Sequence, residues 1–397
     1  QSILKLLDDK EMLYKFSKNS YSFSRHMTWD NVASSYFQTF NKYMDIDKII
    51  ERTIPNIKLK HMLNLTDDFG IIQFANSTSP DIKSGYTLDD NARALLVSSM
   101  HYKHFKDESK LKYLKIYLNF IKYVQQQDGK LYNYVCEEKK INYEEWTDDA
   151  HGRAIWALGY LLSIDFIPED IKLEAGEILK KAIAGLGFIK APRGKAFIIN
   201  GLYYYNQINP SRENVEIIKN FANDLTNLFE NSSNSKWQWF EDSLTYSNSK
   251  LPEAMFLAYL STKDEKFLDV GRKALDFLIS ITFEGGSFAP IGQNGWYAKE
   301  GKKVHFDQQP VDAGSMVQSL IIAYNILKIK KYFNRAKTAF EWFLGNNVLY
   351  QNLYDESSGG CHDGLGESSI NLNQGAESTI AYLIARLSLF EDQHGMV

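Results

Sequence analysis

Two short segments of the chain place aspartates directly before an apolar helical pattern and an Arg-Ala pair. Asp89 and Asp90 precede Arg93, and Asp149 precedes Arg153 with the spacing that separates Asp89 from Arg93. An aspartate at a helix start can cap free backbone N–H groups and suits the positive end of the helix dipole. Each arginine could also simply form an ion pair with the aspartate four residues earlier. The recurrence of the unit favours a shared role at one site.

The chemistry open to such residues is acid–base catalysis at a glycosidic bond, which needs two carboxyl groups on opposite sides of the anomeric carbon. Asp312 and Glu377 also begin apolar helical patterns. Asp312 could be another helix cap, whereas a buried carboxylate at Glu377 would be costly unless it is paired or functional. We expect the catalytic pair to combine Asp89, Asp90 or Asp149 with Glu377 or Asp312 across the molecule.

Polar and aromatic residues gather in the segments that precede the same helices. A sugar needs polar partners for its hydroxyl groups and an aromatic ring for its C–H face. Two structural alternatives stay open: the histidine at 151 could be a satisfied core residue, and of the tryptophans at 237 and 239 one could be core and the other exposed. The candidate substrate-binding residues are Tyr86, Arg93, Trp146, His151, Arg153, Trp237, Trp239, Glu241, Asp242, Trp296, His362, Asp363 and Gln374.

The helical pattern divides into two alternating sets. Six segments are apolar around much of their circumference, and they start near residues 89, 149, 195, 252, 312 and 374. Between them lie amphipathic segments at 108–126, 168–186, 212–231, 264–283 and 330–344, and 46–65 could supply a sixth. A period of about 50 to 60 residues indicates repeated helical hairpins. We predict an all-α fold, an (α/α)6 toroid, with short strands around 285–301 and 353–366. An open solenoid is the alternative, but only a closed ring gathers the polar loops at one mouth.

Composition excludes several classes of partner. The 397 residues carry a net charge of −4 with acids and bases interspersed, which provides no basic stripe for nucleic acid. No apolar run is long enough for a membrane span, and no signal peptide is recognised, so we expect a cytoplasmic protein. Cys136 and Cys361 could form at most one disulfide. The sequence requires no metal and no cofactor, although clustered aspartates could hold Ca²⁺.

The first 45 residues read as two helices, at about 2–16 and 29–43. A Leu-Leu-Asp-Asp segment at 6–9, Phe-Ser at 23–24, Trp-Asp at 29–30 and Tyr-Phe at 36–37 follow in order. This tenth of the chain resembles the last segment of family 4 glycosyltransferases of the GT-B fold. It lacks that family's nucleotide-sugar site, so the resemblance alone implies no sugar transfer by this chain.

The larger part of the chain carries longer motifs, at 65–71, 85–94, 146–149, 359–364 and 373–379. These motifs resemble a bacterial domain that follows family 4 glycosyltransferases and is similar in architecture to six-hairpin glycosidases. The resemblance implies a helical extension at 1–45, a toroid domain at 46–397, and an association with bacterial glycan synthesis or remodelling, with mannose-containing glycans among the candidates. It supplies no catalytic pair.

Three hypotheses of function remain at this stage. The first is a glycosidase-like enzyme domain that acts on an oligosaccharide or glycan through carboxylates at the toroid mouth. The second is a non-catalytic glycan-binding or acceptor-positioning module whose partner is a glycosyltransferase catalytic domain. The third is an epimerase or uronyl hydrolase of similar architecture, for which the acid–base histidine pair expected of an epimerase is not evident.

Overall fold

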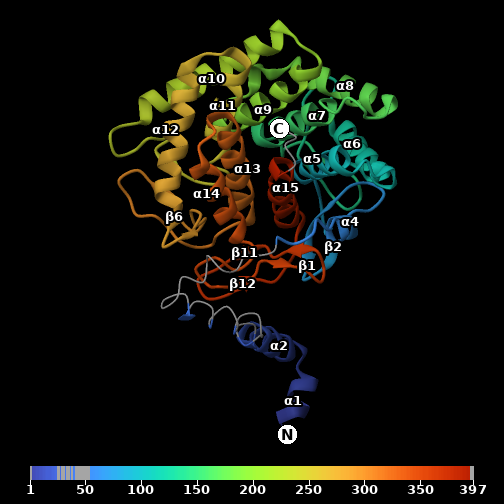
Figure 1. The fold of residues 1–397 in the computed structure, drawn as a ribbon. Coiled ribbons are helices and arrows are strands. Elements are labelled where there is room, and N and C mark those ends of the chain that lie inside the picture. The colour runs from blue at the N-terminus through green and yellow to red at the C-terminus, as the bar shows by residue number, and fades with distance from the viewer. Residues whose placement is uncertain are drawn as a thin grey trace.

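The computed structural model describes residues 2–24, 27, 32, 36, 39–40 and 54–393. An inner ring of helices dominates it, and each inner helix contacts the next one along the chain. The last helix of the ring also packs against the first, as Figure 1 shows for the red helix α15 between α13 and α5. The ring is therefore closed, which confirms the toroid and excludes the open solenoid. The inner helices are α5 (Leu88–Phe105), α7 (Asp148–Leu162), α9 (Pro192–Ile208), α11 (Lys250–Thr262), α13 (Pro310–Leu327) and α15 (Ala376–Gln393).

Five amphipathic helices form an outer layer, each packed on the inner helix that precedes it. In α10, the residues Ile218, Ala222, Leu225 and Phe229 are buried at helical spacing, which explains why this face turns inward. All five agree with the predicted segments. They are α6 (Leu111–Val124), α8 (Glu169–Ile183), α10 (Arg212–Ser232), α12 (Glu265–Thr282) and α14 (Lys330–Glu341). Two 3-10 turns, η3 (Glu108–Lys110) and η4 (Leu186–Phe188), lie between layers.

The predicted helix at 46–65 is wrong in the part that the structure describes. Residues 46–53 lie outside the described residues, 54–59 are not helical, and only α4 (Lys60–Asn64) remains. Proline lacks a backbone N–H and disfavours the helical conformation at the residue before it, so Pro55 opposes a helix here. Its carbonyl instead accepts a hydrogen bond from Arg386 Nε at 2.7 Å.

A four-stranded antiparallel sheet lies at the start of α5, and the sequence patterns do not predict it. The order is β1-β2-β3-β4, with Ile72 paired with Tyr86 and Tyr86 paired with Val135. Since β2 runs directly into α5, the sheet fixes the start of that helix. The strands are β1 (Ile72–Asn76), β2 (Ser79–Thr87), β3 (Tyr134–Val135) and β4 (Ile141–Asn142).

Short two-residue strands occupy the later loops: most lie in or next to the predicted regions at 285–301 and 353–366, whereas β5 (Ser243–Leu244) lies in a loop for which no strand was predicted. β5 pairs with β8 (Tyr297–Ala298), which ties two long loops together. The others are β6 (Phe283–Glu284), β7 (Ser287–Phe288), β9 (Tyr354–Asp355), β10 (Gly360–Cys361), β11 (Gly364–Leu365) and β12 (Ile370–Asn371).

Glycines allow α7 and α9 to approach closely. A Cβ atom at Gly159 would lie 2.0 Å from the carbonyl oxygen of Gly201, and one at Gly152 would lie 2.5 Å from that of Gly194. Any larger residue would force the two backbones apart. This contact sets the separation between the starts of α7 and α9, where Asp149 and Arg193 lie.

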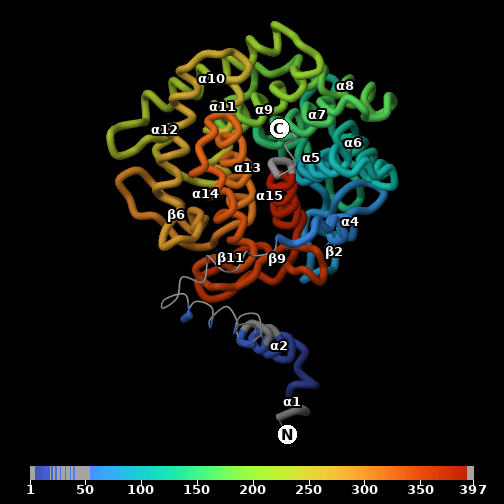
Figure 2. The backbone as a smooth tube through the Cα atoms, viewed as in Figure 1, coloured from blue at the N-terminus to red at the C-terminus, as the bar shows by residue number. Residues whose placement is uncertain are grey.

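The first helices, α1 (Ser2–Asp8) and α2 (Lys10–Ser24), lie outside the ring (Figures 1 and 2). The predicted helix at 2–16 thus breaks near Asp9 and continues further than expected. The second predicted helix, at 29–43, and the division between 1–45 and 46–397 fall mostly or wholly outside the described residues. Within the described part of the chain, no helix has the length and hydropathy needed to cross a membrane.

Candidate active site

The inner helices begin at one end of the ring, which we call the mouth. At two of these starts a threonine is the cap: Thr87 Oγ1 accepts from the Asp90 backbone N–H at 3.1 Å, and Thr147 Oγ1 accepts from that of Ala150 at 3.2 Å. The expected capping role of Asp89 and Asp149 is therefore wrong. Threonine lies in extended conformation immediately before each helix, so the aspartate carboxylates are free to make other contacts.

Arg93 joins three carboxylates at the mouth. Its Nη2 lies 3.1 Å from Asp89 Oδ2 and 2.7 Å from Glu377 Oε2, and its Nη1 lies 3.0 Å from Asp90 Oδ1. The pairing of Arg93 with the aspartate four residues earlier is confirmed. Because Asp89 and Glu377 share one nitrogen, their nearest oxygens are less than about 6 Å apart. Glu377 begins α15, which neighbours α5 in the ring, so this carboxylate is not across the molecule from Asp89 as expected.

Arg153 does not pair with Asp149 but reaches to Asp89 on the neighbouring helix, through Nη1 and Oδ1. Its guanidinium also lies 4.4 Å from the centre of the Phe197 ring. Burial lowers the pKa of Arg153 to about 10. The expected pairing within α7 is thus wrong, and both oxygens of Asp89 are occupied by arginines.

Asp149 forms a hydrogen bond with a residue that is distant in the sequence. The hydroxyl of Tyr246 donates a hydrogen bond to Asp149 Oδ2 at 2.6 Å. Burial raises the pKa of Asp149, while this hydrogen bond and the charges of Arg193 and Arg93 act in the opposite direction. Burial, followed by the charge of Asp149, raises the pKa of Tyr246 to about 12, so the tyrosine keeps its proton and remains the donor.

Two further carboxyl groups are buried at the mouth. Burial raises the pKa of Asp90 to about 6, against the opposing charge of Arg93. Burial also raises the pKa of Asp312 to about 7; its Oδ1 accepts from the Ser247 backbone N–H at 2.7 Å, and its buried Oδ2 has no hydrogen-bond partner among the described residues. Asp312 binds another loop and does not cap α13, so the cap interpretation is wrong here too.

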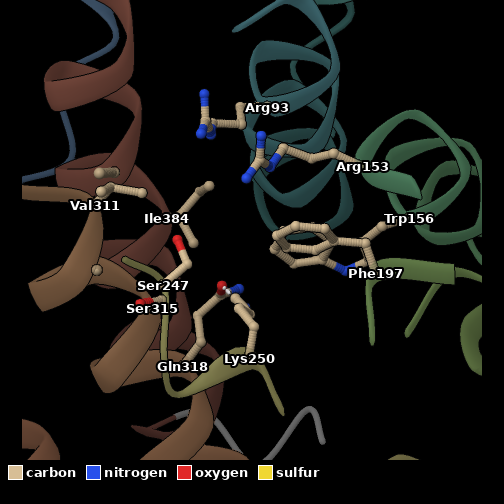
Figure 3. Close-up of a pocket in the computed structure, with 12 residues that line it drawn as sticks. Arg93, Arg153, Trp156, Phe197, Ser247, Lys250, Val311, Ser315, Gln318 and Ile384 are labelled. Atoms are coloured by element: carbon tan, nitrogen blue, oxygen red, sulfur yellow. Dashed lines mark hydrogen bonds between the residues drawn. The ribbon is translucent and has the colours of Figure 1, made fainter. Parts of the chain in front are cut away.

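A pocket lies between the inner helices, lined by residues of α5, α7, α9, α11, α13 and α15 (Figure 3). Centres of water-sized spheres can occupy about 30 Å³ of it, which is room for about two waters in the absence of rearrangement. Arg93 and Arg153 lie together on one side, and Lys250 and Gln318 lie at the other end. Its remaining lining is mostly apolar: Trp156, Phe197, Ser247, Val311, Gly314, Ser315, Ala381 and Ile384.

The floor of the pocket is a buried polar network that our sequence reading missed. Lys250 Nζ donates to both carboxylate oxygens of Glu253 at 2.9 Å and to Gln318 Oε1 at 2.6 Å. Asn200 Nδ2 also donates to Glu253 Oε1 at 2.7 Å, and Ser319 Oγ donates to Oε2 at 2.8 Å. Burial lowers the pKa of Lys250, and Glu253 opposes this. The signal in the sequence was a lysine and a glutamate three residues apart in an otherwise apolar helix.

Two predicted binding residues have structural contacts instead. The buried Tyr86 donates its hydroxyl to Asp67 Oδ2 at 2.5 Å. His151 is fully buried with Nε2 at 3.3 Å from the Ala182 carbonyl oxygen, and burial lowers its pKa to about 4. Neither lines the pocket, so the core interpretation of His151 fits the structure.

The tryptophans of the fourth loop are both in the core. Trp237 and Trp239 have exposed fractions of 4% and 0%, so the expectation that one of them is exposed is wrong. The turns at 235–242 fold both rings inward, where Trp237 Nε1 donates to the Glu241 carbonyl oxygen at 2.8 Å. Trp146 is partly buried, with its ring 5.0 Å from that of Phe188.

The remaining candidates divide between the mouth and its surroundings. Glu241 contacts Arg193 at 3.0 Å, and the ring of Trp296 lies 6.3 Å from that of Tyr246. The side chain of Asp242 is 82% exposed beside Lys299 and is not among the residues that line the pocket.

The sixth loop is held mainly by its own hydrogen bonds. Asp363 Oδ1 accepts from the Gly375 backbone N–H at 2.7 Å, and His362 Nδ1 lies 3.1 Å from the Leu372 carbonyl oxygen. The buried Gln374 donates through Nε2 to Asp355 Oδ2 at 3.1 Å. These residues shape the loop before Glu377.

Cys136 and Cys361 are both free, so the single disulfide that the sequence left open does not form. Among the described residues, no group of three or more histidine, cysteine, aspartate or glutamate side chains has a geometry that could hold a metal ion.

A scan against protein-family models gives no match, and a search of curated proteins gives no significant match. Solved structures do match. A sugar epimerase from a ruminal bacterium has a TM-score of 0.67 at 15% identity, covering 89% of this chain and 99% of that one. A cellobiose 2-epimerase from Bacillus thermoamylovorans has a TM-score of 0.66 at 13% identity, covering 90% and 100%.

A third match is the GH76A α-1,6-mannanase of a Salegentibacter species, with a TM-score of 0.57 at 14% identity, covering 83% of this chain and 95% of that one. That structure is an inactive variant, in which two adjacent aspartates are replaced by asparagine, in complex with α-1,6-mannotriose. At these identities the similarity establishes the shared toroid fold.

Proposed function

We propose that the toroid is a carbohydrate-active domain that hydrolyses a glycosidic bond at its mouth. The observation that carries this proposal is the coexistence of two differently held carboxyl groups there. Both are partly exposed, but Glu377 is ion-paired with Arg93, whereas Asp149 accepts a hydrogen bond from a tyrosine and has a pKa raised by burial. Environments that separate two carboxyl groups in this way are typical of an acid–base pair.

In this proposal each carboxyl group has a distinct role. Asp149, whose pKa is raised by burial, protonates the oxygen of the leaving sugar. Glu377 acts as a carboxylate, either on water or on the anomeric carbon. Asp89 and Asp90 hold Arg93 and Arg153 in place, and these arginines orient sugar hydroxyl groups at the mouth.

Mannose-containing glycans are the proposed substrate class. The resemblance of the sequence motifs and the mannotriose-bound neighbour both support this choice. In that neighbour the inactive variant has two adjacent aspartates replaced, and this chain has adjacent aspartates at the starts of both α5 and α7.

The test is turnover of α-1,6-linked mannooligosaccharides, followed by product analysis. Asp149→Asn and Glu377→Gln should each lower turnover by about 10²- to 10⁴-fold, as for the loss of a general acid or base. Two exposed acids away from the pocket provide matched controls, Asp242→Asn and Glu356→Gln, and these should retain activity. Activity of the two site variants equal to that of the controls would contradict the proposal.

A second function is favoured by a specific observation. Three acids at the mouth are committed to backbone N–H groups: Asp148 accepts from Lys190 and Ala191, Asp312 from Ser247, and Asp363 from Gly375. Such acids are suited to building a rigid binding site. The domain would then hold a glycan for a glycosyltransferase partner in the cytoplasm, and calorimetry would detect binding without products.

An epimerase has less support from the site. The described histidines are His61, His101, His104, His151, His305 and His362, and none of them lines the pocket. The pocket itself therefore supplies no pair of imidazoles for proton transfer.

A further inference from the structure

The loop at 241–248 is clamped by one buried arginine of α9. Arg193 donates through Nε to the Tyr246 carbonyl oxygen at 2.7 Å and through Nη2 to Thr245 Oγ1 at 2.7 Å. Its Nη1 lies 3.0 Å from Glu241 Oε2, and Nη2 also reaches Asn248 Oδ1 at 3.2 Å. A planar guanidinium that uses all three nitrogens in this way fixes the loop conformation.

The helix on the other side of α11, α13, holds the same loop. Ser247 has a φ of 44°, in the left-handed region, and its N–H donates to Asp312 Oδ1 on α13 at 2.7 Å. Tyr246 is therefore held between α9 and α13, with its hydroxyl on Asp149 of α7 and its ring 4.8 Å from the Arg193 guanidinium.

A second aromatic residue lies beside Tyr246. The ring of Trp296 is 6.3 Å away, and the pairing of β5 with β8 brings the two loops together. Trp296 directly follows the turn at 293–295 and has a φ of 59°, which is costly for a bulky residue. Tyr246 is 39% exposed and Trp296 is partly exposed, so both can meet a ligand at the mouth.

We propose that Tyr246 and Trp296 form the subsite for the leaving sugar, and that the Tyr246 hydroxyl orients Asp149 toward the bond to be broken. This inference rests on the proposed hydrolase function. The aromatic rings would pack on the C–H face of a pyranose. Tyr246 then links the binding of this sugar to the protonation of its glycosidic oxygen, and Arg193 is the positioning residue that holds Tyr246 in place.

The two parts of the proposal are separable by substitution. Tyr246→Phe keeps the ring and removes the hydroxyl, so kcat on a disaccharide should fall about tenfold with little change in KM. Trp296→Ala removes half of the ring pair, so KM should rise roughly five- to tenfold with little change in kcat. A glycosyl fluoride, whose leaving group is not a sugar and needs no proton, should be turned over equally by all three proteins.

The pH profile gives a readout that a purely structural role would not change. The charged groups that act on Asp149 are Asp148 on its own helix, Arg93 on α5, and Arg193 on α9, together with the Tyr246 hydroxyl. Loss of the hydroxyl in Tyr246→Phe removes an interaction that favours the ionised carboxyl, so the limb where activity is lost with rising pH should move to higher pH. Arg193→Gln should produce the same shift, Arg193→Lys a smaller one, and Arg272→Lys, at an exposed arginine, none.

Failure of the subsite can be distinguished from failure of the hydrolase function. If the wild-type protein turns over no substrate, calorimetry of mannose against mannobiose still tests the subsite, because Trp296→Ala should weaken only the binding of the disaccharide. Equal effects of Trp296→Ala on the disaccharide and the glycosyl fluoride, or an unchanged pH profile in Tyr246→Phe, would overturn the inference.

Discussion

The starts of α5 and α7 have the same spacing of threonine, aspartate and arginine but opposite connections. In α5, Arg93 pairs with Asp89 of its own helix and with Glu377. In α7, Arg153 passes over Asp149 and pairs with Asp89. Asp89 thus forms ion pairs with two arginines, whereas Asp149 pairs with neither and accepts a hydrogen bond from Tyr246. The comparison suggests that the first motif supports the site and that the second motif acts in it.

The largest difference between the two motifs is expected when the carboxylate charge is removed from each of them in turn, at Asp89 and at Asp149. Asp89→Asn leaves two buried arginines with fewer partners and should lower the free energy of unfolding by about 3 kcal/mol. Asp149→Asn retains an oxygen that can accept from Tyr246 and should change it by less than about 1 kcal/mol. Urea unfolding of both variants measures the difference.

A combined variant tests the cause. Adding Arg153→Met to Asp89→Asn removes the uncompensated charge, so the pair should be less destabilising than the sum of the single changes. Equal destabilisation by Asp89→Asn and Asp149→Asn would mean that the two motifs play the same structural role.

The two motifs also differ at the next position, where α5 has Asp90 and α7 has Ala150. The pH dependence of stability tests the effect of this difference. The pKa of Asp90 is raised from 3.8 to about 6, so between these values the folded chain holds a proton that the unfolded chain releases. Stability should therefore fall as pH rises from about 4 to 6, by up to about 1.4 kcal/mol per pH unit from this group. Asp90→Asn should remove that part of the slope.

Denaturation midpoints at several pH values, converted to free energies, provide the measurement. Asp312→Asn is the comparison variant: its parent carboxyl has a pKa of about 7, so its loss should flatten the slope up to about pH 7. A slope unchanged by Asp90→Asn would show that this carboxyl is ionised throughout the range.

The smallest expected difference concerns the caps. Thr147→Ala should cost about 1 kcal/mol, the usual value of a lost N-cap. Thr87→Ala should cost about 2 kcal/mol, because Thr87 Oγ1 also donates to Asp90 Oδ2 at 2.8 Å. Thermal unfolding measures both, and Thr→Ser at each position should recover most of the loss. Equal costs would indicate that the hydrogen bond to Asp90 contributes nothing.

Most of the helical fold could be predicted because the evidence for it is local. Segments such as 312–327 are apolar around their circumference, and a helix of this kind must be buried on most sides. The sheet formed by β1 to β4 was not predictable in the same way, since β3 and β4 have only two residues each and β3 pairs with β2 over a long separation in the chain. The non-helical stretch at 54–59 was missed, although Pro55 was visible in the sequence.

The candidate site was predictable as a set of residues and not as a set of roles. Asp89, Asp90, Asp149, Asp312 and Glu377 do converge at the mouth, where Arg93 contacts three of them. Some candidates were of residue types that bind sugars but are buried in the core, namely Trp237, Trp239 and His151. Tyr246 and Arg193 were not among the candidates, because nothing in their local sequence distinguishes them. Lys250 was missed, although Glu253 lies three residues after it in an otherwise apolar helix.

By itself, the sequence determined the repeating inner and outer helices, the closed toroid and the end of the ring at which the acids gather, since helical burial follows from the apolar period of each segment. Only the tertiary structure decided that Arg153 pairs with Asp89 and that Tyr246 meets Asp149. The physical reason is that an ion pair depends on distances of a few ångströms between different helices. The close packing of α7 on α9 through Gly159 and Gly201 helps to set such distances, and residue spacing along the chain does not contain them.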